Sequence, residues 1–310
     1  MKILITGASS HLARALLPSL CADPEISAIT GVDLQPTTLN HPKYQHHQFD
    51  IRSEKLDELM PNQQAVIHMA FVVIPGWLKH RRHHRELIRE LNVSASRHVF
   101  ERCIAHRIPA LIHLSSAVVY GAWADNPAIM DERQPLRAMT GFAYAEDKVA
   151  VEKILDELES VPHAPRIVRL RPHVILGSHA QPLLRNLLRQ PCYPRLPDPQ
   201  PLTQCVWEED VCQAICLALK NSAHGAFNLA ADPPLSFKSM IQYRHRYNFA
   251  LSLAPLIRLH RLLWKFTGSA GEPGWVEGLQ HALAIDSRRA REQLGWQPQK
   301  NSYQCLDSFR

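Results

Sequence analysis

The sequence predicts an α/β protein with a doubly wound parallel sheet, because short apolar stretches alternate with amphipathic stretches along its first half. Nearly continuous apolar strands are typical of a sheet that helices cover on both faces. A chain of 310 residues, of which 45% are hydrophobic and 21% charged, has enough apolar side chains for a sizeable core. This composition excludes intrinsic disorder, collagen-like repeats and coiled coils.

The apolar stretches predict strands at residues 2–6, 28–33, 46–50, 65–73, 110–120 and 166–176. The amphipathic stretches predict helices between them, at residues 11–21, 53–60, 82–106 and 142–159. Pro109 separates the third helix from the fifth strand, because proline does not continue a helix.

After about residue 173 this alternation stops, and five prolines fall between Pro191 and Pro201. We therefore expect a first domain at residues 1–172 and a second, smaller and mainly helical domain at residues 173–310. A helix and a strand within residues 206–229 are expected to return to the sheet of the first domain.

The turn after the first strand has the form of a phosphate-binding loop. Gly7 supplies the tight turn, and Ser10 and Ala13 stand where a glycine-rich loop has its second and third glycine. The backbone N–H groups and the positive end of the following helix suit a pyrophosphate. The Cβ of Ser10 stands where the phosphates approach, and its hydroxyl offers a hydrogen bond to a phosphate oxygen instead.

Asp33 ends the second strand, about 20 residues after the loop, where a carboxylate accepts hydrogen bonds from the adenosine ribose hydroxyls. It would repel a 2′-phosphate, and Leu34 and Gln35 supply no compensating arginine. The sequence therefore favours NAD over NADP.

Tyr144 and Lys148 lie one turn apart on a predicted helix and share a face. An ammonium close to a phenol lowers its pKa from about 10, which makes tyrosine a usable acid and base near neutrality. Ser116 follows the fifth strand at the carboxyl edge of the sheet, where ligands bind. These three residues are the candidate catalytic group.

With these motifs the chain resembles the extended short-chain dehydrogenase/reductase family, the NAD-dependent epimerase/dehydratase group that includes UDP-glucose 4-epimerase. The resemblance extends over nearly the whole chain. In chain order it is carried by Thr6-Gly7, Asp33, Asp50-Ile51, His68-Met69-Ala70, Asn92-Val93, Ser115-Ser116-Ala117-Val118-Val119-Tyr120-Gly121, Tyr144-Ala145-Glu146-Asp147-Lys148, Arg171-Pro172 with Gly177, Trp207-Glu208-Glu209-Asp210-Val211 and Leu294-Gly295-Trp296-Gln297-Pro298.

The resemblance implies a Rossmann fold, NAD as cofactor and a first step in which Tyr144 takes a hydroxyl proton while hydride passes to the nicotinamide. It implies that Lys148 holds the nicotinamide ribose and that Ser116 binds the reacting oxygen. The implied cofactor contacts are Gly7, Ser9, Ser10, His11, Leu12, Asp33, Asp50, Ile51, Met69, Ala70, Phe71, Asn92, Leu114, Tyr144, Lys148, Arg171, Pro172 and Val174. The expected substrate contacts are Ser116, Ala117, Val118, Arg185 and Arg189, the two arginines clamping a diphosphate or, alternatively, belonging to a solvated basic loop.

Three departures from the family pattern leave the substrate open. Ser10 replaces the second glycine, and Phe71 replaces a small residue beside the nicotinamide and narrows the pocket. Val174, Ile175 and Leu176 replace polar positions, and an aliphatic wall offers a sugar ring no hydrogen bonds. The alternatives are hydride transfer on a nucleotide sugar, a hydroxysteroid-dehydrogenase-like reaction on an apolar alcohol or ketone, and a non-catalytic NAD-binding scaffold or sensor.

The net charge of +6 does not by itself identify a nucleic-acid partner, and we expect a small-molecule substrate. No His, Cys or carboxylate spacing indicates a metal site.

Residues 253–266 combine a basic stripe with an apolar side, which fits weak contact with a membrane surface or packing on this chain or a second subunit. Without an apolar run or leader we expect the cytoplasm, and the family resemblance suggests a homodimer formed through helices 82–106 and 142–159.

Overall fold

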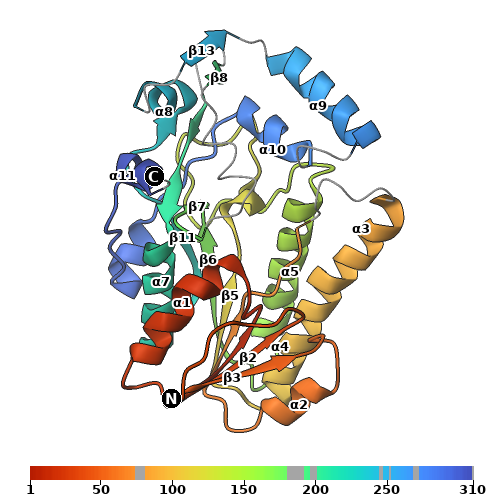
Figure 1. Ribbon diagram of the computed structural model, residues 1–310, viewed down its shortest axis with the longest axis vertical. Helices are drawn as coiled ribbons and strands as arrows, with labels where there is room; N and C mark the ends of the chain where they lie inside the picture. Colours follow the sequence, from red (N-terminus) through yellow and green to blue (C-terminus); the bar gives the residue numbers. More distant parts are fainter. Residues whose placement is uncertain are drawn as a thin grey trace.

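The centre of the protein is a parallel sheet with the strand order β3-β2-β1-β4-β5-β6-β11 (Figure 1). The computed structural model describes residues 1–73, 81–179, 192–195, 201–243, 247–250, 253–267 and 272–308. The seven strands are β1 (Lys2–Thr6), β2 (Ala28–Asp33), β3 (Tyr44–Gln48), β4 (Ala65–His68), β5 (Ala110–Leu114), β6 (Arg166–Pro172) and β11 (Gly225–Leu229). All neighbouring pairs are parallel, and the order reverses between β1 and β4, so the predicted Rossmann arrangement is confirmed.

Helices cover both faces of this sheet, and each layer has its own hydrophobic cluster. Their bounds are α1 (His11–Ala22), α2 (Lys55–Leu59), α4 (Ala95–Ala105), α5 (Ala143–Glu159) and α7 (Glu208–Lys220). α1 and α7 lie on one face, where Leu16 and Ile215 are fully buried, and α4 and α5 lie on the other with Phe100 and Leu155 (Figure 1). The start of α1 and the start of α5 both lie at the carboxyl edge of the sheet, where ligands bind in doubly wound folds.

The long helix expected at residues 82–106 is interrupted by a π-helical turn. α3 (Arg81–Arg89) runs into the turn η1 (Glu90–Ser94), and α4 continues from it. The turn contains Asn92, which is fully buried and points its side chain away from the helix toward Val72. Such turns widen a helix locally and often occur beside functional sites.

Three expected strands end earlier than their apolar runs. β4 stops at His68 instead of residue 73, because Asn92 binds the backbone of Val72 in place of a neighbouring strand. β5 stops at Leu114 instead of residue 120, because Ser116 caps the 3₁₀ turn η2 (Ala117–Tyr120). The stretch 166–176 is divided at His173 into β6 and β7 (Val174–Leu176), and β7 pairs with β10 instead of the main sheet.

The C-terminal part is mainly helical, as expected, and it also contains small sheets that the sequence analysis missed. Its helices are α8 (Phe237–Tyr243), α9 (Leu253–Thr267), α10 (Gly274–Glu277), η3 (Gly278–Gln280), η4 (Ala290–Leu294) and α11 (Ser302–Asp307). Its strand pairs are β7 with β10 (Cys205–Trp207), β9 (Leu202–Thr203) with β12 (Leu235–Ser236), and β8 (Cys192–Arg195) with β13 (Tyr247–Ala250). Strands of two to four residues are too short for a periodic signal.

β11 adds to the edge of the main sheet beside β6, and α7 packs against α1; these are the helix and the strand within residues 206–229. The chain therefore crosses between the two parts more than once. The boundary at residue 172 stays a prediction. Within the described ranges, no helix has both the length and the apolar character needed to cross a bilayer.

Candidate active site

The loop between β1 and α1 is tight because Gly7 adopts a left-handed conformation, with φ at +74°. A Cβ on Gly7 would stand 2.5 Å from the backbone nitrogen of Ala70, in the segment after β4. A side chain at position 7 is therefore excluded both by conformation and by space. The loop and the start of α1 lie at the carboxyl edge of the sheet, as a phosphate-binding turn requires.

Ser10 acts as the N-cap of α1, which explains how the helix begins without the usual second glycine. Its Oγ accepts a hydrogen bond from the backbone N–H of Ala13 at 3.3 Å, and its backbone is extended. A serine hydroxyl that accepts one hydrogen bond still has its own hydrogen to donate. The predicted contact of Ser10 with a phosphate oxygen stays a prediction, and its cap role is compatible with it.

Asp33 lies at the end of β2 and fixes the loop. Its Oδ2 accepts from the N–H of Ser9 at 2.9 Å, and its Oδ1 accepts from the N–H of Gln35 at 2.9 Å. The Ser9 hydroxyl in turn donates to the carbonyl of Gln35 at 3.0 Å. The carboxylate is half-buried and retains acceptor capacity for further donors, so its position suits ribose hydroxyls.

Asp50 and Ile51 follow β3 and differ in their surroundings. Asp50 binds the guanidinium of Arg52, with Nη2 and Oδ2 at 2.7 Å, and this hydrogen bond lowers the pKa of the carboxyl. Ile51 is 8% exposed and belongs to the cluster under α4 and α5. Asp50 is thus a charged group at the surface of the crevice, and Ile51 is mainly a core residue.

The structure brings Ser116, Tyr144 and Lys148 together at the carboxyl ends of β5 and β6. Tyr144 lies in the first turn of α5, and burial raises the pKa of its phenol while a side-chain hydrogen bond with Ser116 offsets part of this rise. The ammonium of Lys148 is 6.0 Å from the centroid of the Tyr144 ring. Lys148 Nζ donates to the carbonyl of Leu114 at 2.7 Å, so β5 positions the lysine as well as the serine.

The expected acidification of Tyr144 is wrong for this structure, because the pKa of the phenol is raised by burial. The half-buried ring is enclosed by Phe142 at 6.0 Å and Trp275 at 5.7 Å between centroids. Burial also lowers the pKa of Lys148 to about 7, which weakens the charge that was expected to stabilise the phenolate. Without an added positive charge or hydrogen-bond donor, Tyr144 stays protonated at neutral pH.

The aromatic ring of Phe71 lies against the ammonium of Lys148. Its ring centroid lies 3.8 Å from Lys148 Nζ, and the ring meets Tyr144 edge-on at 5.4 Å. The next residue, Val72, is held by Asn92, whose Oδ1 accepts from the Val72 N–H at 2.7 Å and whose Nδ2 donates to the Val72 carbonyl at 2.9 Å. Asn92 thus holds the segment that carries Phe71, and a direct contact of Asn92 with a cofactor stays a prediction.

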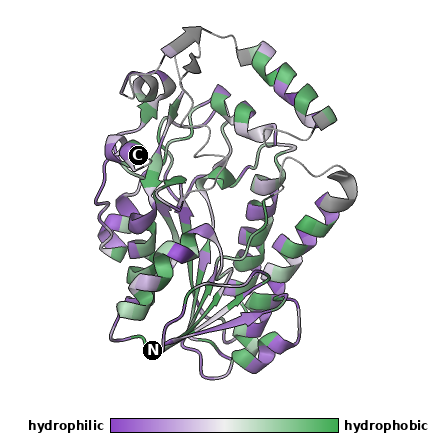
Figure 2. Ribbon diagram, in the orientation of Figure 1, coloured by the Kyte–Doolittle hydropathy of each residue, from purple (hydrophilic) through white to green (hydrophobic). Residues whose placement is uncertain are grey.

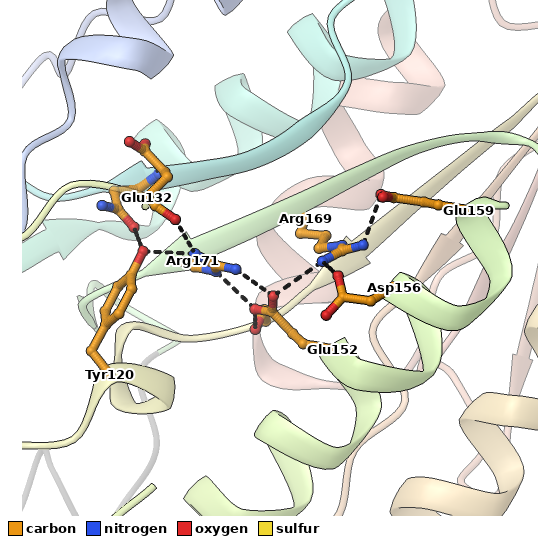
Figure 3. Close-up of polar contacts among 9 residues, drawn as sticks. Tyr120, Glu132, Glu152, Asp156, Glu159, Arg169 and Arg171 are labelled. Atoms are coloured by element: carbon orange, nitrogen blue, oxygen red, sulfur yellow. Dashed lines mark hydrogen bonds and ion pairs between the residues drawn. The ribbon is translucent and has the colours of Figure 1, made fainter. Parts of the chain in front are cut away.

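Arg171 lies in a buried ionic network with Glu152 and Tyr120 (Figure 3). Its Nε donates to Glu152 at 2.8 Å, and its Nη1 donates to the Tyr120 hydroxyl at 2.8 Å. Burial alone would raise the pKa of Glu152, but Arg171 lowers it overall, so the pair is ionic. Ser115 donates to the same carboxylate, and the network therefore connects β5, η2, α5 and β6.

Sequence reasoning missed Glu152 and Ser115, although both stand beside predicted catalytic residues. Glu152 comes one turn after Lys148, and Ser115 directly precedes Ser116. The sequence signal for Glu152 is its place on the core-facing side of an amphipathic helix. A buried carboxylate there needs a positively charged or hydrogen-bonding partner. A contact of Arg171 with a cofactor stays a prediction, since its guanidinium already binds Glu152 and Tyr120.

Glu272 is a second missed residue, and no sequence signal points to it. Its Oε2 accepts from the backbone N–H of Tyr144 at 3.2 Å, although the residues are 128 positions apart. It is 3% exposed, and burial raises its pKa to about 7. Together with Trp275 it brings the C-terminal part of the chain onto the first turn of α5.

The remaining predicted residues differ in burial, and two of them fall outside the described ranges. Met69 donates its N–H to the Thr6 carbonyl at 3.0 Å, which keeps the segment after β4 next to the loop. The other described ones are His11 (exposed), Leu12 and Ala117 (buried), Val118 and Val174 (half-buried) and Pro172 at the end of β6. Arg185 and Arg189 lie outside the described residues. Over the part of the chain that is described, no group of three or more His, Cys, Asp or Glu side chains is arranged to hold a metal ion.

The chain is similar to known proteins over nearly its whole length. It shares 22% identity over 314 aligned positions with the uncharacterized protein Rv0501 of Mycobacterium tuberculosis strain H37Rv, covering 99% of this chain and 82% of that protein. Among solved structures it superposes on MoeE5 in complex with UDP-glucuronic acid and NAD, with a TM-score of 0.76, 19% identity and coverage of 99% and 97%. It superposes on UDP-glucuronic acid 4-epimerase from Bacillus cereus in complex with NAD with a TM-score of 0.75, 19% identity and coverage of 100% and 98%.

At these identities the solved structures establish the fold of the chain. The family follows from a separate comparison, in which the NAD dependent epimerase/dehydratase family matches residues 3–230. This range contains the phosphate loop, Asp33 and the group of Ser116, Tyr144 and Lys148. The chain therefore belongs to the NAD dependent epimerase/dehydratase family.

Proposed function

We propose that this protein is an NAD-dependent oxidoreductase or epimerase that moves hydride at a secondary alcohol of a nucleotide-sugar-like substrate. The observation that carries the proposal is the assembly of Ser116, Tyr144 and Lys148 beside the loop that contains Gly7. The complexes of MoeE5 and of the Bacillus cereus epimerase support both NAD and a nucleotide sugar as ligands.

The residues present fit a dinucleotide at its adenosine and diphosphate end. Gly7 lets the loop pack against the backbone of Ala70, where a Cβ would collide, and the first N–H groups of α1 lack acceptors within the helix. Asp33 has acceptor capacity for the ribose hydroxyls, which favours NAD over NADP. When bound, NAD supplies the hydride acceptor.

The chain's own residues would handle the proton and the orientation of the substrate. Ser116 Oγ would hold the reacting oxygen. Tyr144 would take its proton as the phenolate during oxidation and return it from the hydroxyl during reduction, with the positive charges of Lys148 and of the oxidised cofactor favouring the phenolate. Lys148 holds the ribose and supplies positive charge to the phenol. In the described geometry this ammonium has the Leu114 carbonyl and the Phe71 ring as partners, which leaves one of its three N–H donors for a ribose hydroxyl.

A hydroxysteroid-dehydrogenase-like reaction on an apolar alcohol or ketone is the second candidate. It is favoured by the apolar surroundings of Tyr144, which is enclosed by Phe71, Phe142 and Trp275. The aliphatic strand β7 also favours an apolar substrate. A scaffold or sensor without turnover is disfavoured, because it would not need Ser116, Tyr144 and Lys148 in one place.

The deciding experiment compares substrates on the purified protein. Absorbance and mass measurements should find NAD bound or should give a dissociation constant for added NAD. UDP- and dTDP-sugars are then tested beside a panel of apolar secondary alcohols, with Tyr144→Phe as the inactive control. Turnover of sugars supports the proposal, turnover of apolar alcohols alone replaces it with the second candidate, and failure to bind NAD contradicts both.

We also propose a cytoplasmic homodimer that pairs α4 and α5 with their copies. The groove between these helices is lined by Val93, His98, Ala150 and Ile154, and the ion pair of Arg97 with Glu157 at 2.9 Å spans it. Light scattering should give twice the chain mass of 35.2 kDa, and Ala150→Arg should halve it by placing a charge in the groove. A monomeric mass for the unmodified protein would exclude this dimer.

A further inference from the structure

The helix α9 has three distinct faces. One face packs on the protein through Ile257 and His260, which are 8% and 7% exposed. The opposite side carries four exposed apolar side chains, Leu259, Leu262, Leu263 and Phe266, with exposed fractions of 54%, 53%, 41% and 77%. We call these four residues the apolar strip. In Figure 2, α9 lies at the periphery and displays hydrophobic and hydrophilic turns side by side.

The third face is basic and borders the apolar strip. On a helical wheel the strip spans about 100°, and Arg258, Arg261 and Lys265 occupy an adjacent sector of about 60°. Lys265 Nζ lies 5.9 Å from the centroid of the Phe266 ring, so the cation stands at the edge of the strip. Arg261 Nε binds Glu277 of α10 at 2.6 Å, which holds the helix in this orientation.

We propose that α9 is a docking surface for an anionic lipid bilayer. The apolar strip enters the boundary between headgroups and acyl chains, and Arg258 and Lys265 meet lipid phosphates beside it. A helix of 15 residues with one face on the protein suits a position along the membrane surface. This inference is independent of the proposed reaction, because attachment requires neither NAD nor turnover.

The charge pattern favours lipid over a second copy of the chain. Residues 233–271 contain no Asp or Glu, whereas they include Lys238, Arg244, Arg246, Arg258, Arg261 and Lys265. A two-fold dimer through α9 would bring Arg258 and Lys265 close to their own copies. A standard interface also uses about 20 or more residues on each side, far more than the four of the apolar strip.

Flotation of the full-length protein with lipid vesicles tests this proposal. Vesicles of phosphatidylcholine alone are compared with vesicles that also contain phosphatidylglycerol, at low and high salt. We expect the protein to float with the phosphatidylglycerol vesicles and to be released by salt, because screening weakens the basic contacts. Sedimentation of all protein away from both vesicles at low salt would overturn the proposal.

Two double variants separate the apolar and basic contributions. Leu262→Glu with Phe266→Glu should lower vesicle partitioning at least about tenfold, because both side chains are exposed and a glutamate disfavours the acyl region. Arg258→Gln with Lys265→Gln should lower it at least about fivefold on anionic vesicles alone. The matched controls are Ile129→Glu and Arg288→Gln, which lie elsewhere on the surface. Ile129 is 51% exposed, and the side chain of Arg288 is 73% exposed. Both control variants should bind vesicles as the unmodified protein does.

Partitioning that falls equally in the control variants would contradict a specific surface on α9. Light scattering of the same proteins tests whether a second copy of the chain, rather than lipid, binds the apolar strip. A change in mass for Leu262→Glu with Phe266→Glu, without any vesicle binding by the unmodified protein, would assign the apolar strip to a second copy and overturn the lipid proposal. Circular dichroism confirms that each variant is folded before it is scored.

Discussion

The two ends of the candidate site are built differently. The adenosine end consists mainly of backbone and one carboxylate, with Gly7 and Asp33 in the positions that the sequence predicts. The catalytic end is covered by aromatic side chains from three separate segments, Phe71, Phe142 and Trp275. The comparison shows that the proposed adenosine end is shaped mainly by backbone conformation, whereas the surroundings of Tyr144 and Lys148 are shaped by side chains from distant segments.

Tyr144→Phe should have the largest effect, since it removes the only proposed proton carrier at the catalytic end. We expect turnover to fall at least about a hundredfold, with NAD binding unchanged. Steady-state rates and NAD titration measure the two quantities separately. Unchanged turnover would remove Tyr144 from the mechanism, and a matched loss of NAD binding would mean that the two ends are not independent.

Gly7→Ala tests the adenosine end. The new Cβ would stand 2.5 Å from the Ala70 backbone, and we expect the dissociation constant for NAD to rise at least about tenfold. Gly295→Ala is the matched control, because Gly295 also has a positive φ of +70°, whereas a Cβ added there would meet no atom within 4 Å. Equal effects on NAD binding by both variants would show that general strain, rather than the close approach at Gly7, is responsible.

Phe71→Ala should strengthen NAD binding, in contrast to Gly7→Ala. Removing the ring frees the ammonium of Lys148, which lies 3.8 Å from its centroid, and NAD affinity should increase about fivefold. Isothermal titration of both proteins gives the comparison. Weaker NAD binding in the variant would indicate that the ring packs against the cofactor instead of covering the lysine.

The smallest expected effect is on the pH dependence of stability, to which Glu272 contributes. Burial raises its folded pKa to about 7 from an ordinary value of 4.5, so the folded state holds this proton more tightly. Stability from this group is therefore present at low pH and is lost as the pH rises through about 7. We expect the Tm of the unmodified protein to fall by a few degrees more than that of Glu272→Gln between about pH 5 and pH 8.

Parallel slopes for the two proteins in this pH range would show that Glu272 ionises freely. In that case the contact of its Oε2 with the Tyr144 N–H would contribute little to the packing of the C-terminal part on α5. The measurement thus tests whether this connection between the two parts is sensitive to protonation.

The main sheet could be predicted because its strands carry the signal themselves. β1 (Lys2–Thr6) and β2 (Ala28–Asp33) are short, largely apolar runs next to a turn and a helix, and both were predicted with their true bounds. The ends of the strands were less accurate, since Asn92 and Ser116 end β4 and β5 early through side-chain hydrogen bonds. Such bonds depend on which segments meet in the folded chain.

The sequence by itself determined the doubly wound parallel sheet, the phosphate turn at Gly7, the carboxylate of Asp33 and the spacing of Tyr144 and Lys148. These follow from local periodicity, backbone conformation and residue type. Only the tertiary structure decided the protonation of Tyr144, the cover of Phe71 on Lys148 and the contact of Glu272 with α5. The physical reason is that burial and charge are set by segments that are distant in the chain, and such packing raises the pKa of Tyr144 where the sequence predicts that it is lowered.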